Sequence, residues 1–197
     1  MPAVHTQDED SEQLDVVIVG AGMSGLLMGI RLKRAGISRF RIFEKASSIG
    51  GTWRENRYPG LSCDVPSFFY SYSFEPKLDW THRFSPGPEI RAYFESVADK
   101  YDIRRFISFE NPVESARYED GGWSIQTGRG EQLRAKVLIA ATGPLHHKNY
   151  PAIAGLDSFA GALFHSADWD EDVEMDGARI GVIGNGSTGV QMMRPLS

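Results

Sequence analysis

Two features near the start of the chain have the residue types and spacing needed to hold a dinucleotide. The pattern Gly20-x-Gly22-x-x-Gly25 directly follows an apolar run over residues 16–19. The first glycine permits a tight turn, the second lets a pyrophosphate approach the backbone, and the third lets a helix pack on a strand. The helix start directs free amides and a positive dipole end at the phosphates, and the Ser24 hydroxyl can donate there too.

An acidic residue follows at the distance that a ribose contact requires. Residues 39–44 are typical of a short strand that ends in Glu44, roughly twenty residues after the glycines. A carboxylate at this place accepts both ribose hydroxyls and repels a 2′-phosphate. The predicted ligand of this turn is therefore FAD or NAD, and not NADP. The alternative is that Glu44 is an ordinary solvated acid at a strand end.

The same device occurs a second time near the end of the chain. Residues 179–183 predict a strand, and Gly184-x-Gly186-x-x-Gly189 predicts a turn and a helix start. Two such units in one chain imply two nucleotides.

The elements between the two turns predict an α/β fold. The chain reads as a strand, a helix and a second strand, then an amphipathic helix over 88–101, a strand over 106–109, an antiparallel β-meander over 112–134 and a fully buried strand over 136–143. This is the layout of an FAD-binding, Rossmann-like domain of the glutathione-reductase type with a meander insertion. We predict a disordered leader over 1–13, a partial FAD-binding domain over 14–148, a connector over 149–176 and the start of a second nucleotide-binding Rossmann unit over 177–197.

Composition and charge exclude several classes of function. A net charge of −5 without a basic run gives no footprint for nucleic acid. Cys63 is the one cysteine, which excludes an internal disulfide and a redox-active cysteine pair and fits a reducing, cytoplasmic location. The apolar stretch over 16–30 is too short and too glycine-rich for a membrane span. The pair His146-His147 has no acid or cysteine at metal-ligand spacing, so no metal is predicted.

Nine aromatic residues lie between Gly51 and Phe84, among glycines and prolines. Long ordered loops of this kind are usually functional, and flat apolar walls suit a flat ligand ring. The alternative for any single ring is that it closes the core beneath the loop.

The two glycine patterns, the Ala141-Thr142-Gly143 strand end and the segment between them resemble the class B flavoprotein monooxygenases. Residues 159–170 match FxGxxxHxxxW[P/D], the fingerprint of the Baeyer-Villiger monooxygenases, at every specified position. Gly50-Gly51-Thr52-Trp53, residues 56–60 and Cys63-Asp64 also look like that family. The relatives that oxidise nitrogen and sulfur usually carry Tyr or Phe in place of Trp169.

The resemblance implies an FAD- and NADPH-dependent enzyme that inserts one oxygen of O2 beside a ketone carbonyl, by way of a C4a-peroxyflavin, to give an ester or lactone. The partners implied are a small-molecule ketone and O2, with neither nucleic acid nor a membrane; the number of subunits is left open.

The resemblance also implies roles for individual residues. Glu44 would hold the FAD ribose, and the backbone of Val113 would touch the adenine end. Thr52, Trp53, Asp64 and Tyr70 would line the flavin. Ser62, Cys63 and Asp64 would face the nicotinamide nucleotide, whose pyrophosphate would lie against the second turn, made of Gly184, Asn185, Gly186, Ser187, Thr188, Gly189 and Gln191.

Asp64 is the residue with the predicted catalytic role, since in the family it orients an arginine that stabilises a developing anion. A carboxylate beside that anion requires such a cationic partner. The alternative is a loop acid that caps nearby amides. His165 is expected to serve as a packing and hinge element of the connector rather than as an acid or base.

Family members are much longer than this chain, and the arginine expected to partner Asp64 lies outside it. We therefore expect the 197-residue chain by itself to lack turnover. Two other readings stay open, a nitrogen- or sulfur-oxidising flavin monooxygenase and a catalytically silent FAD-binding module.

Overall fold

The computed structural model describes residues 12–145 and 147–197. The chain divides into two compact units, one from Met1–Ile49 with Tyr101–Thr142 and one from Gly50–Lys100 with Gly143–Ser197. Each unit joins segments that are distant in the sequence, whereas the predicted domains follow chain order. Glu12 and Gln13, from the predicted leader, belong to the first strand, and the rest of that leader lies outside the described residues.

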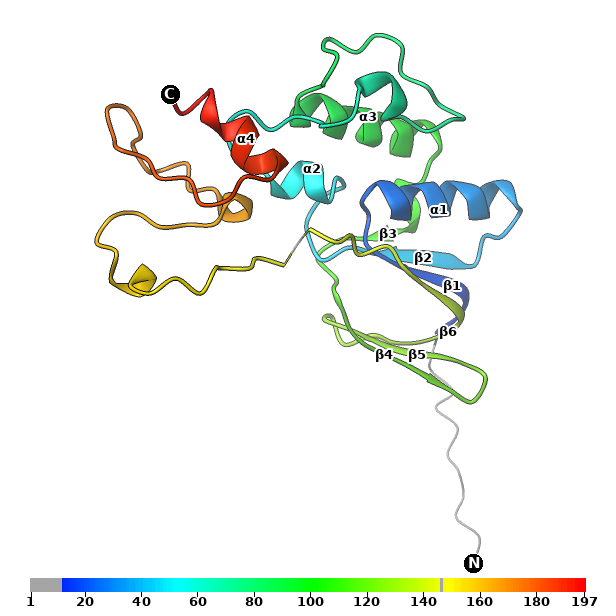
Figure 1. Cartoon of the computed structure of the whole chain (residues 1–197). Coiled ribbons are helices and arrows are strands. Elements are labelled where there is room, and N and C mark those ends of the chain that lie inside the picture. The colour runs from blue at the N-terminus through cyan, green and yellow to red at the C-terminus, as the bar shows by residue number, and fades with distance from the viewer. Residues whose placement is uncertain (1–11, 146) are drawn as a thin grey trace, which may run out of the picture. The chain divides into compact units, whose positions relative to one another are not determined.

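The first unit is built on a six-stranded mixed sheet (Figure 1). Its strands are β1 Glu12–Val19, β2 Phe40–Phe43, β3 Ile107–Ser108, β4 Val113–Glu119, β5 Gly122–Thr127 and β6 Gln132–Ala140, in the order β3-β2-β1-β6-β5-β4. The neighbours β3, β2, β1 and β6 run parallel, and β5 and β4 continue the sheet antiparallel. The predicted α/β fold with a β-meander is confirmed.

Helix α1, Met23–Arg34, covers one face of β1 and β2 (Figure 1). Side chains at alternate strand positions point to this face, and Ile18, Ile42 and Phe40 are buried there. A Cβ placed on Gly29 of α1 would lie 2.9 Å from Ile42 Cδ1, so helix and strand are in close contact. β1 needs apolar residues at successive positions because it is covered on both sides.

The face of the sheet opposite α1 also carries buried side chains. Residues from β1, β2, β5 and β6 form one buried cluster there, made of Leu14, Val17, Phe43, Ile125, Leu133 and Ala135. Val113, at the start of β4, packs against this cluster. The inserted strands β4 and β5 therefore contribute side chains to the same core as β1 and β2.

Strand β6 differs from its prediction in two ways. The third meander strand and the strand expected over 136–143 are one strand, which pairs with β5 over residues 132–135 and with β1 over residues 133–140. It is also not fully buried, because Val137 is 47% exposed on a face that the described residues leave uncovered. One strand can serve both pairings because each uses a different edge of its backbone.

The second unit contains three helices and long irregular segments. The helices are α2 Thr52–Glu55, α3 Gly87–Lys100 and α4 Ser187–Met193, with short 3-10 turns at Ser67–Phe69, Leu156–Ser158 and Ser166–Asp168. Helix α3 confirms the amphipathic helix predicted over 88–101. Its predicted apolar face is buried at Ile90, Tyr93, Phe94 and Val97.

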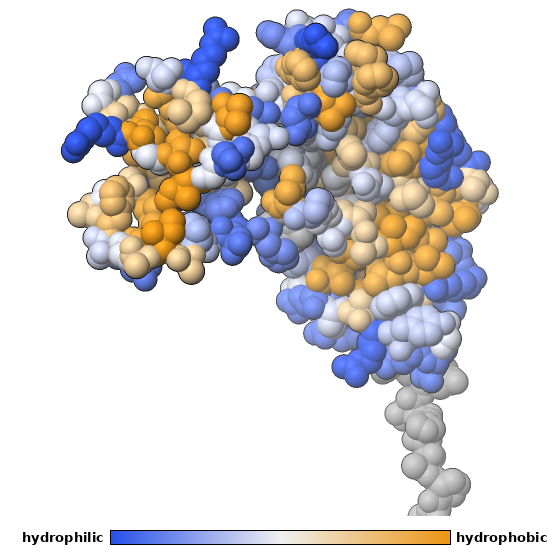
Figure 2. Space-filling model, viewed as in Figure 1, coloured by the Kyte–Doolittle hydropathy of each residue, from blue (hydrophilic) through white to orange (hydrophobic). Residues whose placement is uncertain are grey.

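The strand predicted over 179–183 is not formed in the structure. A strand satisfies its amides and carbonyls through a neighbour, and none of the described strands pairs with this segment. Ile183 is 62% exposed as a result. Figure 2 shows apolar side chains gathered on the surface of the segment that Figure 1 draws in yellow and orange, to which Phe159 and Leu163 also belong.

None of the helices in the described part of the chain is long and apolar enough to cross a bilayer.

Gly25, in the first turn of α1, has no room for a side chain. A Cβ on Gly25 would lie 1.9 Å from the Gly20 carbonyl oxygen, and backbone cannot move aside as a flexible side chain can. We expect Gly25→Ala to lower the free energy of unfolding by about 2 kcal/mol or more in urea denaturation. Gly181→Ala is the matched control, because nothing lies within 4 Å of its Cβ. Equal midpoints for the two variants would contradict this packing.

Candidate functional site

The first glycine turn has the backbone geometry that its pattern predicts. Gly20 directly follows β1 with φ 102°, a conformation that side chains disfavour, and its amide donates to the Phe43 carbonyl at 2.7 Å. Gly22 occupies the N-cap of α1, so no side chain stands between that helix end and a ligand. Ser24 is exposed in the first helical turn. The turn therefore joins β1, β2 and α1, and its N-cap position carries no side chain.

Glu44 lies where β2 ends and is buried, with 4% of its surface exposed. One carboxylate oxygen accepts from the Ala21 amide of the glycine turn at 2.7 Å, and the other accepts from the Ala46 amide at 3.0 Å. The alternative reading of Glu44 as a solvated acid is wrong. A carboxylate has about four lone-pair sites, so one carboxylate can accept from backbone amides and from hydroxyl groups together.

Within the second unit, the second glycine turn repeats the geometry of the first. Gly184 has φ 115°, and a Cβ on Gly189 would lie 2.4 Å from the Gly184 carbonyl oxygen. Asn185, Gly186 and Ser187 are exposed, with Gly186 at the N-cap of α4. The turn and helix start form here without the strand that was expected to precede them.

The loop over residues 58–64 packs against helix α4 inside the second unit. The Tyr58 hydroxyl donates to Gln191 Oε1 at 2.8 Å, and Gln191 Nε2 donates to the Ser62 carbonyl at 2.9 Å. A Cβ on Gly60, which has φ 83°, would lie 2.4 Å from the Gln191 carbonyl oxygen. Predicted nucleotide residues from two distant parts of the sequence thus meet in one contact.

Asp64 belongs to the same contact. Its carboxylate accepts from the Ser187 hydroxyl at 2.9 Å, across 123 sequence positions. Asp64 itself is exposed. This bond places the predicted catalytic carboxylate beside the first residue of α4, and its acceptor capacity leaves room for a cationic partner.

Trp53 and Tyr70, predicted to line the flavin, also contact each other. Trp53 Nε1 donates to the Tyr70 hydroxyl at 3.2 Å, and the two rings meet edge to face at 5.5 Å. Burial raises the pKa of Tyr70, against a smaller lowering effect of the Trp53 hydrogen bond. Thr52 begins α2 beside them, and its carbonyl accepts from the Asn56 side chain.

Four of the seven other aromatic rings of this loop fall into two contrasting pairs. Tyr58 and Tyr72 are buried, which confirms the core-closing alternative for them. Phe68 and Phe69 are 63% and 68% exposed and lie 4.0 Å apart between centroids, so that alternative is wrong for them.

A family model described as pyridine nucleotide-disulphide oxidoreductase matches residues 17–193. The chain belongs to this family.

Relatives within the family are monooxygenases. The chain is 52% identical to an uncharacterised monooxygenase of Mycobacterium bovis over 92% of its length and 37% of the relative's. It is 45% identical to a Baeyer-Villiger monooxygenase of Streptomyces coelicolor over 92% of the chain and 35% of that protein. The resemblance to the Baeyer-Villiger monooxygenases is confirmed, and the chain spans little more than a third of the length of these relatives.

Solved structures give the same result. An oxidised steroid monooxygenase bound to NADP matches with a TM-score of 0.82 and 45% identity, over 93% of this chain and 36% of the other. OTEMO in complex with FAD and NADP matches with a TM-score of 0.84 and 37% identity, over 94% and 36%.

The family description includes disulphide chemistry, yet this chain contains one cysteine. Cys63 is buried, its amide donates to the Ser85 carbonyl at 2.9 Å, and its sulfur accepts from the Val65 amide at 3.4 Å. Burial raises the pKa of the thiol, and the charge of Asp64 adds to this effect. The thiol of Cys63 is therefore packed within the loop over 58–64.

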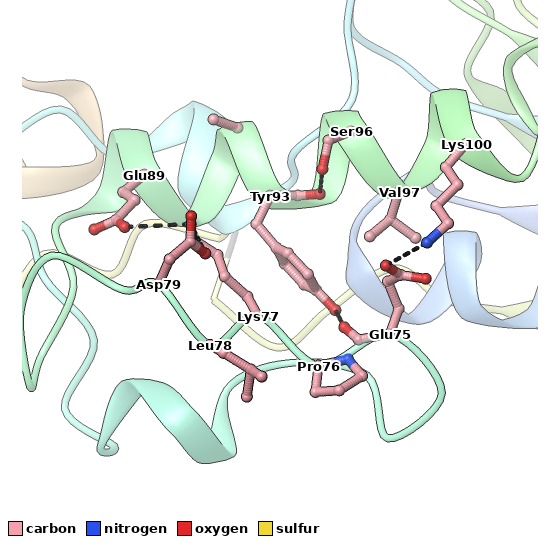
Figure 3. A pocket seen from close by; sticks show the side chains of 11 residues that line it. Glu75, Pro76, Lys77, Leu78, Asp79, Glu89, Tyr93, Ser96, Val97 and Lys100 are labelled. Carbon is pink, nitrogen blue, oxygen red and sulfur yellow. Dashed lines mark hydrogen bonds and ion pairs between the residues drawn. The ribbon is translucent and has the colours of Figure 1, made fainter.

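His165 makes packing contacts, and the cavity of the second unit is lined by residues other than those predicted to bind a nucleotide. His165 Nδ1 accepts from the Ala167 amide at 3.0 Å and its ring packs on Tyr150, which agrees with a packing role. A cavity of about 570 Å³ lies between helix α3 and residues 75–79 (Figure 3). Its charged residues pair with one another, as Glu75 does with Lys100 at 2.7 Å. Its lining includes none of the predicted cofactor residues.

Among the described residues, no group of three His, Cys, Asp or Glu side chains is arranged to hold a metal ion. His146 of the predicted loop pair lies outside the described residues.

Sequence reasoning missed the roles of Tyr58 and Gly60 in holding Gln191. The Pro59-Gly60 pair signals a turn, but nothing local indicates its partner 131 positions further along the chain.

The contact between Gly60 and α4 leads to a stability prediction. A side chain at this position meets both a positive φ and the Gln191 backbone. We expect Gly60→Ala to destabilise the second unit by about 2 kcal/mol, with faster amide hydrogen exchange in α4. Gly177→Ala serves as the control, because it shares the positive φ at 73° but has nothing within 4 Å. Equal effects of the two substitutions would show that φ strain alone matters.

Burial of Cys63 leads to a reactivity prediction. Because its pKa is raised, less of the thiol is ionised at neutral pH, and thiolate is the reactive form. We expect the folded chain to react with Ellman's reagent at least about tenfold more slowly than the chain in urea. Equal rates would contradict the buried environment.

Proposed function

We propose that this chain supplies the FAD-binding segment and the first NADP-binding segment of a Baeyer-Villiger-type flavoprotein monooxygenase. The substrates proposed are NADPH, O2 and a small-molecule ketone, and the product is an ester or lactone. The observation that carries the proposal is Glu44, whose buried carboxylate lies at the end of β2 and contacts the glycine turn through the Ala21 amide.

The residues of the first unit fit the adenosine end of FAD. Gly25 lets α1 approach the backbone of Gly20, and Gly20 lets the turn approach the backbone of Ala141 after β6, so closely that no Cβ fits at either position. Gly22 leaves the N-terminus of α1 open to a pyrophosphate, whose charge the helix dipole favours. Glu44 would accept the ribose hydroxyls, and Val113 would contact the adenine through its backbone, since its side chain packs into the core.

The residues of the second unit fit the nicotinamide nucleotide. The turn from Gly184 to Gly189 would hold its pyrophosphate, with Ser187 as a hydroxyl donor. Ser62, Cys63 and Asp64 would face the nucleotide from the loop that Gln191 anchors. Thr52, Trp53 and Tyr70 are proposed to line the flavin, since the Trp53 and Tyr70 rings are held together by a hydrogen bond and an edge-to-face contact beside Thr52.

Bound FAD would supply the transfer of electrons from NADPH to O2 and of one oxygen to the ketone. The chain's part is to bind, orient and shield. Asp64 is proposed to orient a cationic group towards the reacting centre, because an unpaired carboxylate would repel an anion there. The hydrogen bond from Ser187 fixes the direction of the carboxylate.

Oxygen insertion beside a carbonyl is favoured over nitrogen or sulfur oxidation by the segment from Phe159 to Asp170. Trp169 packs edge to face on Phe164 at 5.2 Å, so the residue that separates the two groups of relatives has a structural role in the connector. Conversion of a ketone to its ester by the complete translation product that contains this chain would support the proposal. Oxidation of an amine or sulfide alone would contradict it.

A second candidate function is flavin binding without turnover by the 197-residue chain alone. The unpaired segment over 179–183 favours it, since the second nucleotide unit lacks its first strand.

On the evidence of the single cysteine, we also propose a cytoplasmic location.

The ribose contact can be tested directly by flavin titration. We expect the wild-type chain to bind FAD, and Glu44→Gln to weaken binding about tenfold, which is the effect of losing one charged hydrogen bond. Gln keeps the side-chain volume and an acceptor for the Ala21 amide. Glu171→Gln, an exposed change of the same chemistry, should leave the affinity unchanged. Absence of flavin uptake by the wild-type chain would refute the binding proposal, and rapid ketone-dependent NADPH consumption would refute the expectation that this chain lacks turnover.

A further inference from the structure

We propose that Asn111 is a positioning residue for FAD, which acts through Glu44 and is itself held by Glu131 in the turn between β5 and β6. This inference rests on the proposed function of Glu44 as the ribose ligand. It assigns a role to the β-meander beyond completing the core.

Asn111 is fully buried, and its side-chain amide is satisfied on every side. Nδ2 donates to Glu131 Oε1 at 2.6 Å and to Ser108 Oγ at 3.0 Å, and Oδ1 accepts from the Arg129 amide at 3.2 Å. A buried amide with three good partners has one stable orientation, because any rotation leaves polar groups unpaired.

The backbone of residues 108–111 is hydrogen-bonded to the segment that carries Glu44. The Asn111 amide donates to the Glu44 carbonyl at 3.0 Å, and the Glu44 amide donates to the Ser108 carbonyl at 2.9 Å. The Glu110 amide donates to the Ala46 carbonyl at 2.9 Å. Glu110 has φ 51°, so the chain accepts an unfavourable conformation at this place. Both flanks of Glu44 are fixed by residues 108–111.

An ion pair anchors the other end of the network. Arg41 of β2 donates to Glu131 Oε2 at 2.6 Å, and both side chains are about a quarter to a third exposed. Burial raises the pKa of Glu131, but the hydrogen bonds from Arg41 and Asn111 outweigh it, and the net pKa is lowered. Glu131 is therefore ionised at neutral pH and accepts on both oxygens.

The network explains how one carboxylate keeps its direction at a strand end. A ligand contact must be held within about 0.5 Å to be effective, and it depends on surrounding residues whose own positions are locked. The Glu44 carboxylate accepts from the amides of Ala21 and Ala46, and its backbone is hydrogen-bonded to Ser108 and Asn111. Its orientation follows from where β2 ends, and residues 108–111 determine that place.

The hydrogen-bond pattern suggests a charge-conserving exchange as the test. Asn111→Asp alone sets two carboxylates against each other where the Nδ2–Oε1 bond was. Adding Glu131→Gln restores a donor, since the new amide can donate to Asp at position 111 and still accept from Arg41. The bonds to Ser108 and to the Arg129 amide can also persist, because a carboxylate accepts from both. Asn149→Asp, an exposed change of the same chemistry, is the control.

We expect Asn111→Asp to weaken FAD binding about tenfold or more and the double variant to recover most of this loss. In a Glu44→Ala background the same Asn111→Asp substitution should have less than about a threefold effect, because residues that act as a unit are not additive. Full additivity, or no recovery in the double variant, would overturn the proposal.

A measurement without flavin separates this inference from the proposed function. Amide hydrogen exchange at Glu44 and Ala46 should accelerate in Asn111→Asp and return to the wild-type rate in the double variant. Unchanged exchange at these amides overturns the positioning role, whatever the flavin result. Loss of protection throughout the sheet would overturn it as well, since it would show a general folding defect. Failure of the wild-type chain to bind FAD refutes the proposed function and, with it, the role of Asn111 in flavin binding.

Discussion

The bond from the Ala21 amide to the Glu44 carboxylate is the contact on which the first unit is organised. It joins the turn after β1 to the end of β2, beside the place where Gly25 lets α1 approach the Gly20 carbonyl within backbone contact. A buried carboxylate is costly unless it is hydrogen-bonded. The hydrogen bonds from the amides of Ala21 and Ala46 offset this cost. They hold the Glu44 carboxylate at the place where the adenosine of FAD is proposed to lie.

In the second unit, a glycine again permits a close backbone contact. Gly60 permits the loop over 58–64 to touch the backbone of α4, and the side chains of Tyr58 and Gln191 then close two hydrogen bonds. Asp64 and Ser187 are neighbours as a consequence. The proposed catalytic carboxylate is thus tied to the proposed nucleotide turn through backbone proximity, which an added methyl group would remove.

Local sequence patterns correctly predicted the elements whose conformation is set by nearby residues. The glycine turns, helix α3 and the antiparallel hairpin between β4 and β5 depend on neighbours a few positions away. The predictions for residues 179–183 and 136–143 were less accurate, because strand formation and burial depend on neighbouring strands and on covering layers that are distant in the sequence. The first segment has no described strand as a partner and forms none, and the second continues from the meander as part of β6 with Val137 exposed.

The sequence by itself determined the two nucleotide turns, the acid at position 44 and membership in a family of flavin and pyridine nucleotide enzymes, because glycine φ angles and strand-helix periodicity are encoded locally. Only the tertiary structure decided that Glu44 is buried on the glycine turn, that Asn111 and Glu131 brace it, and that Asp64 meets Ser187. These contacts join residues between 20 and 123 positions apart. Hydrogen bonds over such separations depend on how the chain packs, and no local preference specifies them.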